Sequence, residues 1–140
     1  MIILDTNVVS ELMRPRPARS VVEWIVSQDS QSLYLSAVSE AELRYGVEIL
    51  PAGQRREGLR AAMEAMFRED FAGRILPFDS PSTQAYATIA ACRRVSGRPI
   101  NHEDCQIAAI ASTRSASVAT RDASGFEGCG VEVINPWIHG

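Results

Sequence analysis

The chain has 140 residues, of which 46% are apolar and 22% are charged, and its formal net charge is −3. This length and composition predict one folded domain over residues 1–140 and exclude a largely disordered chain. All fourteen basic residues are arginines, which excludes Walker A nucleotide-binding loops, Schiff-base enzymes and protein kinases, because each of these needs a lysine.

Short apolar segments alternate with amphipathic ones along the chain. Predicted strands cover residues 2–4, 33–35, 74–78, 117–120 and 131–134. Predicted helices cover residues 6–13, 18–28, 38–50, 55–71, 81–95 and 102–114. Strands separated by helices predict an α/β fold, in which α-helices sandwich a central, mostly parallel β-sheet.

The sequence has no segment that predicts export or membrane insertion. The first residues reach a charge at Asp5 after only a few apolar side chains, which is unlike a signal peptide. No apolar run approaches the roughly 18 residues that span a bilayer. The three cysteines are widely spaced and form no CxxC pair, which indicates reduced thiols. We therefore expect a cytoplasmic protein without a membrane segment.

Two aspartates follow predicted strands. Asp5 comes directly after the strand at 2–4 and opens a helix, and Asp122 comes shortly after the strand at 117–120. Either could simply be a cap or turn residue, because a carboxylate at a helix start accepts hydrogen bonds from free N–H groups. However, parallel sheets bind ligands beyond the carboxyl ends of their strands, so both positions also suit a functional site.

Glu42 is the clearest candidate within a helix. At 3.6 residues per turn it shares a face with Val38, Tyr45 and Ile49, whereas Glu40 belongs to a ladder of charges on another face. Glu42 is therefore expected on an inward apolar stripe. A carboxylate in such a place is costly unless it pairs with an arginine or binds a cation, and both alternatives stay open.

Asp104 lies in the first turn of the helix that is predicted to begin at His102. Asn101 is the expected N-cap, with Asp104 as its partner three residues later. Asp104 also begins an apolar stripe that continues through Ile107, so it is expected to point toward the core side. A simple helix-start acid and a functional carboxylate are both compatible with this position.

These four carboxylates are expected to converge on one crevice at the edge of the sheet. Two unit charges about 4 Å apart repel by roughly 4 kcal/mol at an effective dielectric constant of 20, so such a cluster requires a cation. No set of cysteines or histidines accompanies them. Oxygen ligands alone favour Mg²⁺, with Mn²⁺ as a substitute, and such a pocket suits hydrolysis of a phosphodiester.

Five motifs extend over nearly the whole chain. They are IILDTNVVSE at 2–11, LSAVSEAELRYG at 35–46, FAGRILPFD at 71–79, TRD at 120–122 and NPW at 135–137. In order and spacing they resemble the PIN-domain ribonucleases, and specifically the VapC/FitB-type toxins of type II toxin–antitoxin modules.

The resemblance implies a PIN fold and a metal-dependent endoribonuclease that hydrolyses RNA phosphodiester bonds. It assigns the family's four acidic positions, as catalytic and metal-binding residues, to Asp5, Glu42, Asp104 and Asp122. It assigns the supporting small polar positions to Thr6 and Thr120. It also implies a homodimer, and a hetero-oligomer with a VapB-type antitoxin whose C-terminal segment covers the pocket.

The expected mechanism is attack of water on the RNA backbone. Asp5 and Asp104 would be the main ligands of Mg²⁺, directly or through water, while Glu42 and Asp122 would hold outer-shell waters or orient the nucleophile. Two alternatives are a structure-specific DNA nuclease of the same fold and a non-catalytic interaction module whose acids pair with a partner's arginines.

Arginine is the only side chain that can supply strong phosphate contacts in this chain. The candidates lie around the prolines at 15 and 17, before the predicted helix at 102–114 and beside Asp122; they are Arg14, Arg16, Arg19, Arg93, Arg94, Arg98 and Arg121. For each of them a solvated surface charge is the more ordinary role.

Overall fold

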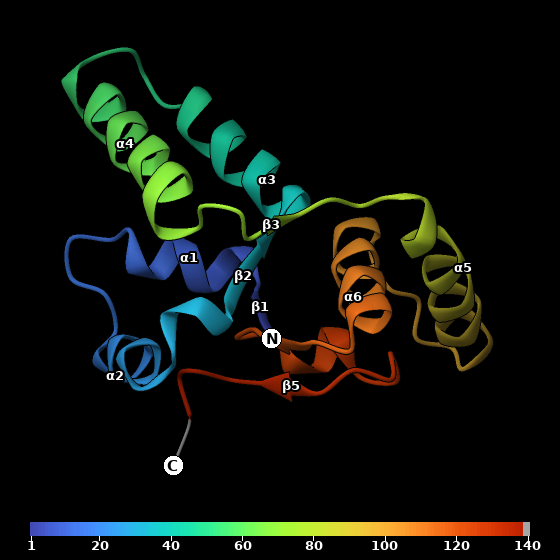
Figure 1. The fold of residues 1–140 in the computed structure, drawn as a ribbon. Helices are drawn as coiled ribbons and strands as arrows, with labels where there is room; N and C mark the ends of the chain where they lie inside the picture. Colours follow the sequence, from blue (N-terminus) through green and yellow to red (C-terminus); the bar gives the residue numbers. More distant parts are fainter. Residues whose placement is uncertain (139–140) are drawn as a thin grey trace.

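All five strands lie parallel in one sheet, in the order β3-β2-β1-β4-β5. The computed structural model describes residues 1–138 (Figure 1). The strands are β1 (Ile2–Leu4), β2 (Leu33–Ser36), β3 (Ile75–Leu76), β4 (Ser117–Ala119) and β5 (Val133–Ile134). In the central strand β1, Leu4 pairs with Ala119 of β4. The carboxyl ends of β1 and β4 are therefore side by side.

Helices fill the segments between the strands, as the sequence pattern predicts. The α-helices of residues 1–138 are α1 (Thr6–Leu12), α2 (Arg19–Ser27), α3 (Ala37–Glu48), α4 (Gln54–Ala65), α5 (Ser80–Val95) and α6 (His102–Arg114). Shorter helical turns are the 3₁₀ helices η1 (Ser30–Ser32) and η3 (Ala123–Phe126) and the π-helical turn η2 (Met66–Asp70).

Different helices cover the two faces of the sheet. Figure 1 shows α1 to α4 on one side and α5 and α6 on the other, and each group packs into its own apolar cluster. Along β1, Leu4 belongs to the first cluster and Ile3 to the second, because successive strand side chains point to opposite faces. Burying each contributes roughly 1.5–3 kcal/mol to stability. The expected α/β sandwich is confirmed.

Most predicted elements differ from the observed ones by one or two residues at an end, and three of the differences have a clear structural cause. The predicted strand at 74–78 is reduced to β3, because Pro77 has no N–H for the ladder. The strand predicted from Val131 begins only at Val133, after Gly130, whose φ of 73° is left-handed. The helix predicted over 55–71 is α4 followed by η2, which the Phe71 N–H closes with a bond to the Met66 carbonyl.

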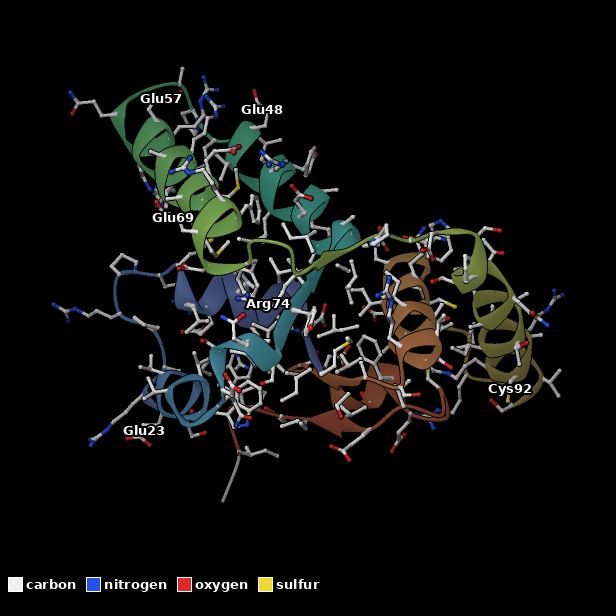
Figure 2. All side chains as sticks on the ribbon, in the orientation of Figure 1. Glu23, Glu48, Glu57, Glu69, Arg74 and Cys92 are labelled. Carbon is white, nitrogen blue, oxygen red and sulfur yellow. The ribbon has the colours of Figure 1, made fainter. Side chains whose placement is uncertain are left out.

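Charged side chains gather at the far end of the α3–α4 pair. Arg60 lies 2.9 Å from Glu48 and 2.8 Å from Glu57, and Figure 2 labels both glutamates there. Such exposed pairs contribute little to stability. Among residues 1–138, no helix is long and apolar enough to cross a membrane.

Candidate active site

Asp5 is buried at the point where β1 passes into α1. As the N-cap of α1, it accepts a hydrogen bond from the Thr6 N–H at its Oδ1, 2.8 Å away. Its Oδ2 accepts a hydrogen bond from the Thr120 hydroxyl group at 2.8 Å. Asp5 is only 6% exposed. Each carboxylate oxygen can accept a second bond, so capping does not exclude a functional role.

Thr120 connects Asp5 to Asp122. While its hydroxyl group donates to Asp5, the same oxygen accepts from the Asp122 N–H at 3.1 Å and from the Asn7 side-chain amide at 3.2 Å. Thr120 is fully buried just after β4. Buried, satisfied polar networks are rigid, so this hydroxyl group sets the relative position of the two aspartates.

Asp122 caps the short helix η3. Its Oδ1 accepts hydrogen bonds from the Gly125 N–H at 3.3 Å and from the Ser124 hydroxyl group at 3.0 Å. A methyl group placed on Gly125 would lie 2.8 Å from Oδ2 of Asp122 and 3.3 Å from Oδ2 of Asp104. The two carboxylates therefore face the same small space above Gly125.

Asp104 lies in the first turn of α6, as expected. Asn101 is the N-cap, and its side-chain oxygen accepts from the Asp104 N–H at 2.8 Å. The Asn101 amide in turn donates to Oδ2 of Asp104, also at 2.8 Å. Asn101 thus caps the helix through its side-chain oxygen and holds the Asp104 side chain at the helix start through its amide group.

The expected position of Glu42 on an inward apolar stripe is wrong. Glu42 is exposed, and on its face Tyr45 is 66% and Ile49 is 63% exposed. The inward stripe of α3 contains Leu43 and Val47 instead, because α3 turns that side toward the sheet. Although it is exposed, the Glu42 side chain still lines the cavity that contains the other three acids.

The carboxylate of Glu42 contacts the start of α1. Its Oε1 lies 2.9 Å from the Thr6 hydroxyl group, which donates to it, and Thr6 also lies 2.9 Å from the Ser39 hydroxyl group. A buried ion pair with an arginine, the open alternative for Glu42, is not seen among residues 1–138. Thr6 therefore joins Glu42 to Asp5, whose Oδ1 accepts its N–H.

The expected convergence of the four acids is observed. One cavity of about 570 Å³ lies at the carboxyl ends of β1 and β4. Its lining includes Asp5, Thr6, Glu42, Asp104 and Asp122. Thr120 does not line the cavity itself, but its hydroxyl group holds Asp5 in the cavity wall.

The cavity is an unfavourable place for negative charge. Burial raises the pKa of Asp5, and the Glu42 and Asp122 charges raise it further, against the hydrogen bonds from Thr120 and Thr6 that lower it. Burial likewise raises the pKa values of Glu42 and Asp104, and the Asp5 charge adds to the effect on Asp104. Such shifts are typical of carboxylates that bind a cation or a proton in function.

The donor set suits a hard, hydrated cation. Among residues 1–138, no three His, Cys, Asp or Glu side chains lie close enough together to hold a metal ion by themselves, as the ligands of a closed cage do. Zinc sites in proteins usually are closed cages of that kind, whereas Mg²⁺ keeps several waters and takes one or two carboxylates directly. A spread group of carboxylates around an open cavity therefore fits Mg²⁺ or Mn²⁺ better than Zn²⁺.

The rim of the cavity carries basic and aromatic groups. Arg14 and Arg121 line it, and the Arg121 guanidinium lies 5.1 Å from the centre of the Trp137 ring. The sequence indicated both arginines as candidate phosphate contacts, whereas Trp137 and Glu11, which also line the cavity, stood there only as members of the NPW and IILDTNVVSE motifs. No local pattern places Trp137 there, because it reaches the site only after β5 has paired with β4.

Two of the other candidate arginines, Arg93 and Arg98, do not line the cavity. Arg93 is buried at 6% exposure, so it is neither a solvated charge nor a group in the rim of the cavity. Arg98 pairs with the Glu127 carboxylate. Phosphate contact from these two residues is thus not supported by their positions.

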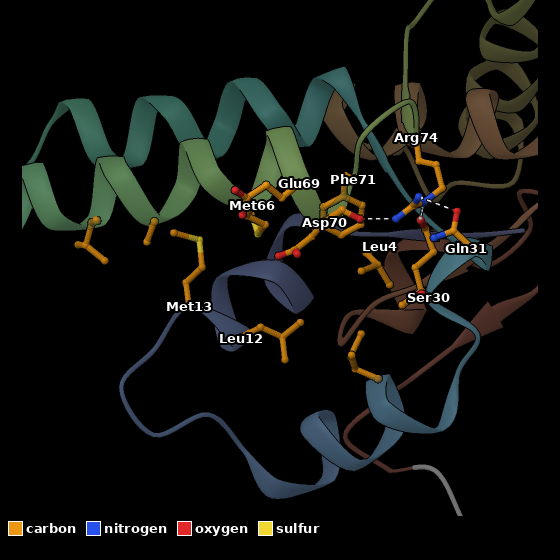
Figure 3. A pocket seen from close by; sticks show the side chains of 14 residues that line it. Leu4, Leu12, Met13, Ser30, Gln31, Met66, Glu69, Asp70, Phe71 and Arg74 are labelled. Atoms are coloured by element: carbon orange, nitrogen blue, oxygen red, sulfur yellow. Dashed lines mark hydrogen bonds between the residues drawn. The ribbon is translucent and has the colours of Figure 1, made fainter.

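A second, apolar cavity lies apart from the acids. It has a volume of about 670 Å³ between α1, α2 and the end of α4, with side chains such as Leu12, Met13 and Met66 in its wall. Figure 3 shows Glu69 and Asp70 in its lining, with Arg74 hydrogen-bonded to both Gln31 and the Asp70 carbonyl. This cavity lacks the four carboxylates and is unsuited to phosphodiester chemistry.

Comparison with known proteins identifies the fold family. The family model described as PIN domain matches residues 2–127. The chain belongs to the PIN-domain family. The VapC ribonuclease Y4jK of Sinorhizobium fredii is 46% identical over 98% of both chains. Toxin FitB of Neisseria gonorrhoeae is 45% identical over 98% of this PIN-domain chain and 99% of its own length.

Solved structures agree with this placement in the VapC and FitB branch. The structure of FitAB bound to an IR36 DNA fragment superposes with a TM-score of 0.95 at 44% identity, and covers all of this chain and 98% of the matched one. Solved VapBC complexes also match, including one of a toxin–antitoxin system from Mycobacterium tuberculosis. The resemblance inferred from the five motifs is therefore confirmed.

Proposed function

We propose that this PIN-domain protein is a metal-dependent endoribonuclease and the toxin of a toxin–antitoxin module. The observation that carries the proposal is the cavity in which Asp5, Glu42, Asp104 and Asp122 meet, three of them with raised pKa values. The relative named as a VapC ribonuclease supports RNA as the substrate. A cytoplasmic location belongs to the same proposal.

Each carboxylate has a distinct proposed role. Asp5 and Asp104, both held by helix-start hydrogen bonds, would be the ligands of Mg²⁺. Glu42 and Asp122 would hold surrounding waters, and one of them would accept the proton of the attacking water. The bond from phosphorus to the leaving ribose oxygen would break in the same step, and that oxygen would take up a proton from solvent. When bound, Mg²⁺ would polarise the phosphoryl group and lower the pKa of a water ligand.

The supporting side chains fix these carboxylates in place. The Thr6 hydroxyl group orients Glu42, and the Thr120 hydroxyl group orients Asp5 while it holds the Asp122 backbone. Arg14 and Arg121 at the rim would contact the RNA phosphates on either side of the cleaved bond, because an arginine fork holds a phosphate through two parallel bonds.

The proposed protein partners are an antitoxin and a second copy of the chain. Solved relatives named as FitAB and as a toxin–antitoxin system support the antitoxin, which would cover the acidic cavity in a hetero-oligomer. Exposed apolar side chains on α3, Tyr45 and Ile49, support a homodimer, because they lie one helical turn apart on the same face and contiguous apolar patches mark interaction sites.

Cleavage assays with matched variants test the nuclease. The purified protein is expected to cut RNA with Mg²⁺ or Mn²⁺ and to stop when EDTA is added. Asp104→Asn should lose at least a hundredfold in rate, whereas Asp29→Asn should not, because Asp29 is likewise an acid at the start of a helical segment but is exposed and outside the cavity. Equal rates for Asp104→Asn and the wild type would contradict the assignment.

The same assays separate the two alternatives. A structure-specific DNA nuclease would cut duplex or branched DNA faster than RNA, with the same loss for Asp104→Asn. A non-catalytic interaction module would neither bind Mn²⁺ nor cut any nucleic acid. Co-expression with the product of a neighbouring short reading frame tests the antitoxin, which should co-purify and suppress cleavage.

A further inference from the structure

Arg93 is a buried cation within α5. It lies on the inward stripe of this helix with Ser82 and Ile89, and only 6% of it is exposed. Its neighbour Arg94 is exposed. A buried guanidinium is costly unless its donors are paired, so the partners of Arg93 indicate what it is there to hold.

Backbone carbonyl groups are the main partners of Arg93. Its Nε donates to the Arg98 carbonyl at 2.6 Å, and its Nη1 donates to the carbonyls of Gly125 at 2.9 Å and Glu127 at 2.8 Å. Nη1 also lies 3.6 Å from the Cys129 sulfur. Among residues 1–138, no carboxylate forms an ion pair with Arg93. The charge is therefore used to bind backbone, not to neutralise an acid.

The segment that Arg93 holds is the one that carries Asp122. Asp122 caps η3, and Gly125 within η3 donates its N–H to the Asp122 carboxylate. On one side of Gly125 the carbonyl accepts from Arg93, and on the other side the α-carbon faces Asp122 and Asp104. One residue thus separates the guanidinium from the wall of the acidic cavity.

We propose that Arg93 is a positioning residue that holds Asp122 against the repulsion of the other carboxylates. Asp5 and Asp104 carry the same charge as Asp122 and face the same cavity, so repulsion pushes the η3 segment outward in the absence of a cation. The bonds from Arg93 to Gly125 and Glu127 oppose that movement. The inference rests on the proposed function for its catalytic meaning, because Asp122 matters to activity only in a metal site.

Lysine cannot replace Arg93 in this role. The guanidinium presents several donors in a rigid fork, so one side chain reaches the Arg98 carbonyl through Nε and the η3 carbonyls through Nη1. An ammonium group has the same charge but sits at a single point. Arg93→Lys therefore separates the geometry of the fork from the charge, and Arg93→Met removes both.

Hydrogen exchange of the metal-free protein tests the anchoring directly. The peptide over residues 121–129 is expected to exchange at least tenfold faster in Arg93→Met and about threefold faster in Arg93→Lys. Arg94→Met is the matched control and should exchange like the wild type. Unchanged exchange of this peptide in both Arg93 variants would overturn the proposal. The measurement does not depend on nuclease activity.

Mn²⁺ binding in a double-mutant cycle tests whether Arg93 acts through Asp122. Arg93→Lys is expected to weaken Mn²⁺ binding about tenfold in the wild-type background and to have no effect in Asp122→Asn, because the group it positions is then already altered. An equal loss in both backgrounds would show a general structural role and overturn the proposal. A wild type that binds no Mn²⁺ and cuts no RNA would refute the nuclease, while the exchange result would still decide the anchoring.

Discussion

The hydroxyl group of Thr120 donates a hydrogen bond of 2.8 Å to Oδ2 of Asp5, between residues that are 115 positions apart in sequence. The parallel pairing of Leu4 with Ala119 brings the two side chains together at the ends of β1 and β4. The same hydroxyl oxygen accepts the Asp122 N–H. One buried threonine thus sets the spacing of two carboxylates in the candidate active site.

Thr120→Val is expected to destabilise the protein by about 1–3 kcal/mol, because it leaves the Asp122 N–H without its partner and removes the shorter of two hydrogen bonds to Oδ2 of Asp5. Loss of this hydrogen bond also raises the pKa of Asp5 further, since the bond lowers it. Urea unfolding measures the loss of stability. Mn²⁺ titration at several pH values measures the raised pKa of Asp5, because protons and Mn²⁺ compete for the carboxylate. Thr120→Ser keeps the hydroxyl group and should retain most of both properties; a serine variant as impaired as the valine variant would contradict this account.

Asp104→Asn is expected to stabilise the metal-free protein while it abolishes Mn²⁺ binding. The substitution removes one negative charge from the cavity, where the Asp5 charge raises the pKa of Asp104. Burial is the larger cause of this raised pKa and the Asp5 charge the second; because Asp104 is only partly buried, the gain is about 0.5–1 kcal/mol at neutral pH. Thermal unfolding in EDTA measures it, with Asp29→Asn as the control. A lower melting temperature for Asp104→Asn would argue against repulsion in the cavity.

The pH dependence of stability has a defined sign. Burial raises the pKa of Asp5 and Asp104 above their ordinary value of 3.8, and that of Glu42 above 4.5. A raised carboxyl pKa stabilises the folded state below the unfolded pKa, and this stability is lost as the pH rises through the folded pKa. The advantage of Asp104→Asn should therefore be absent near pH 4 and grow toward neutral pH, in urea unfolding at each pH with EDTA present.

Mn²⁺ affinity is expected to change with pH in the opposite direction. The cation binds the ionised carboxylates and competes with protons for them, so affinity falls as the pH drops through the raised pKa values of Asp5 and Asp104. The fall should begin above the pH at which ordinary carboxylates take up protons. Titrations from pH 7 down to about pH 4, the ordinary range of a carboxyl pKa, measure it. A fall that begins no earlier than protonation of an ordinary carboxylate would contradict the raised pKa values.

Replacing Tyr45 and Ile49 by aspartate is expected to shift the protein from dimer to monomer. These side chains are 66% and 63% exposed on α3, and a charge on each would prevent apolar contact with a second copy. Sedimentation at micromolar concentration measures the mass. Val26→Asp on α2 is the matched control, since Val26 is 77% exposed. Equal masses for the double variant and the control would exclude α3 as the interface.

The sequence by itself determined the succession of strands and helices along the chain and the positions of the acids that follow the strands. Apolar runs and helix-start residues are local signals, so the positions of Asp5, Asp104 and Asp122 followed from their immediate neighbours. The lengths of β3 and β5 were less certain, because Pro77 and the glycines before Val133 limit pairing only when the partner strand is in place.

The tertiary structure alone decided which way Glu42 and Arg93 face. Helical periodicity shows which residues share a face, but it does not show which face a neighbouring element covers, so Tyr45 and Ile49 were wrongly expected to point inward. The burial of Arg93 depends on carbonyl groups more than 30 residues further along the chain, whose positions exist only once η3 has packed against α5. From sequence alone a charged side chain is expected to be exposed. Arg93 is buried because hydrogen bonds to distant carbonyl groups compensate for the loss of water.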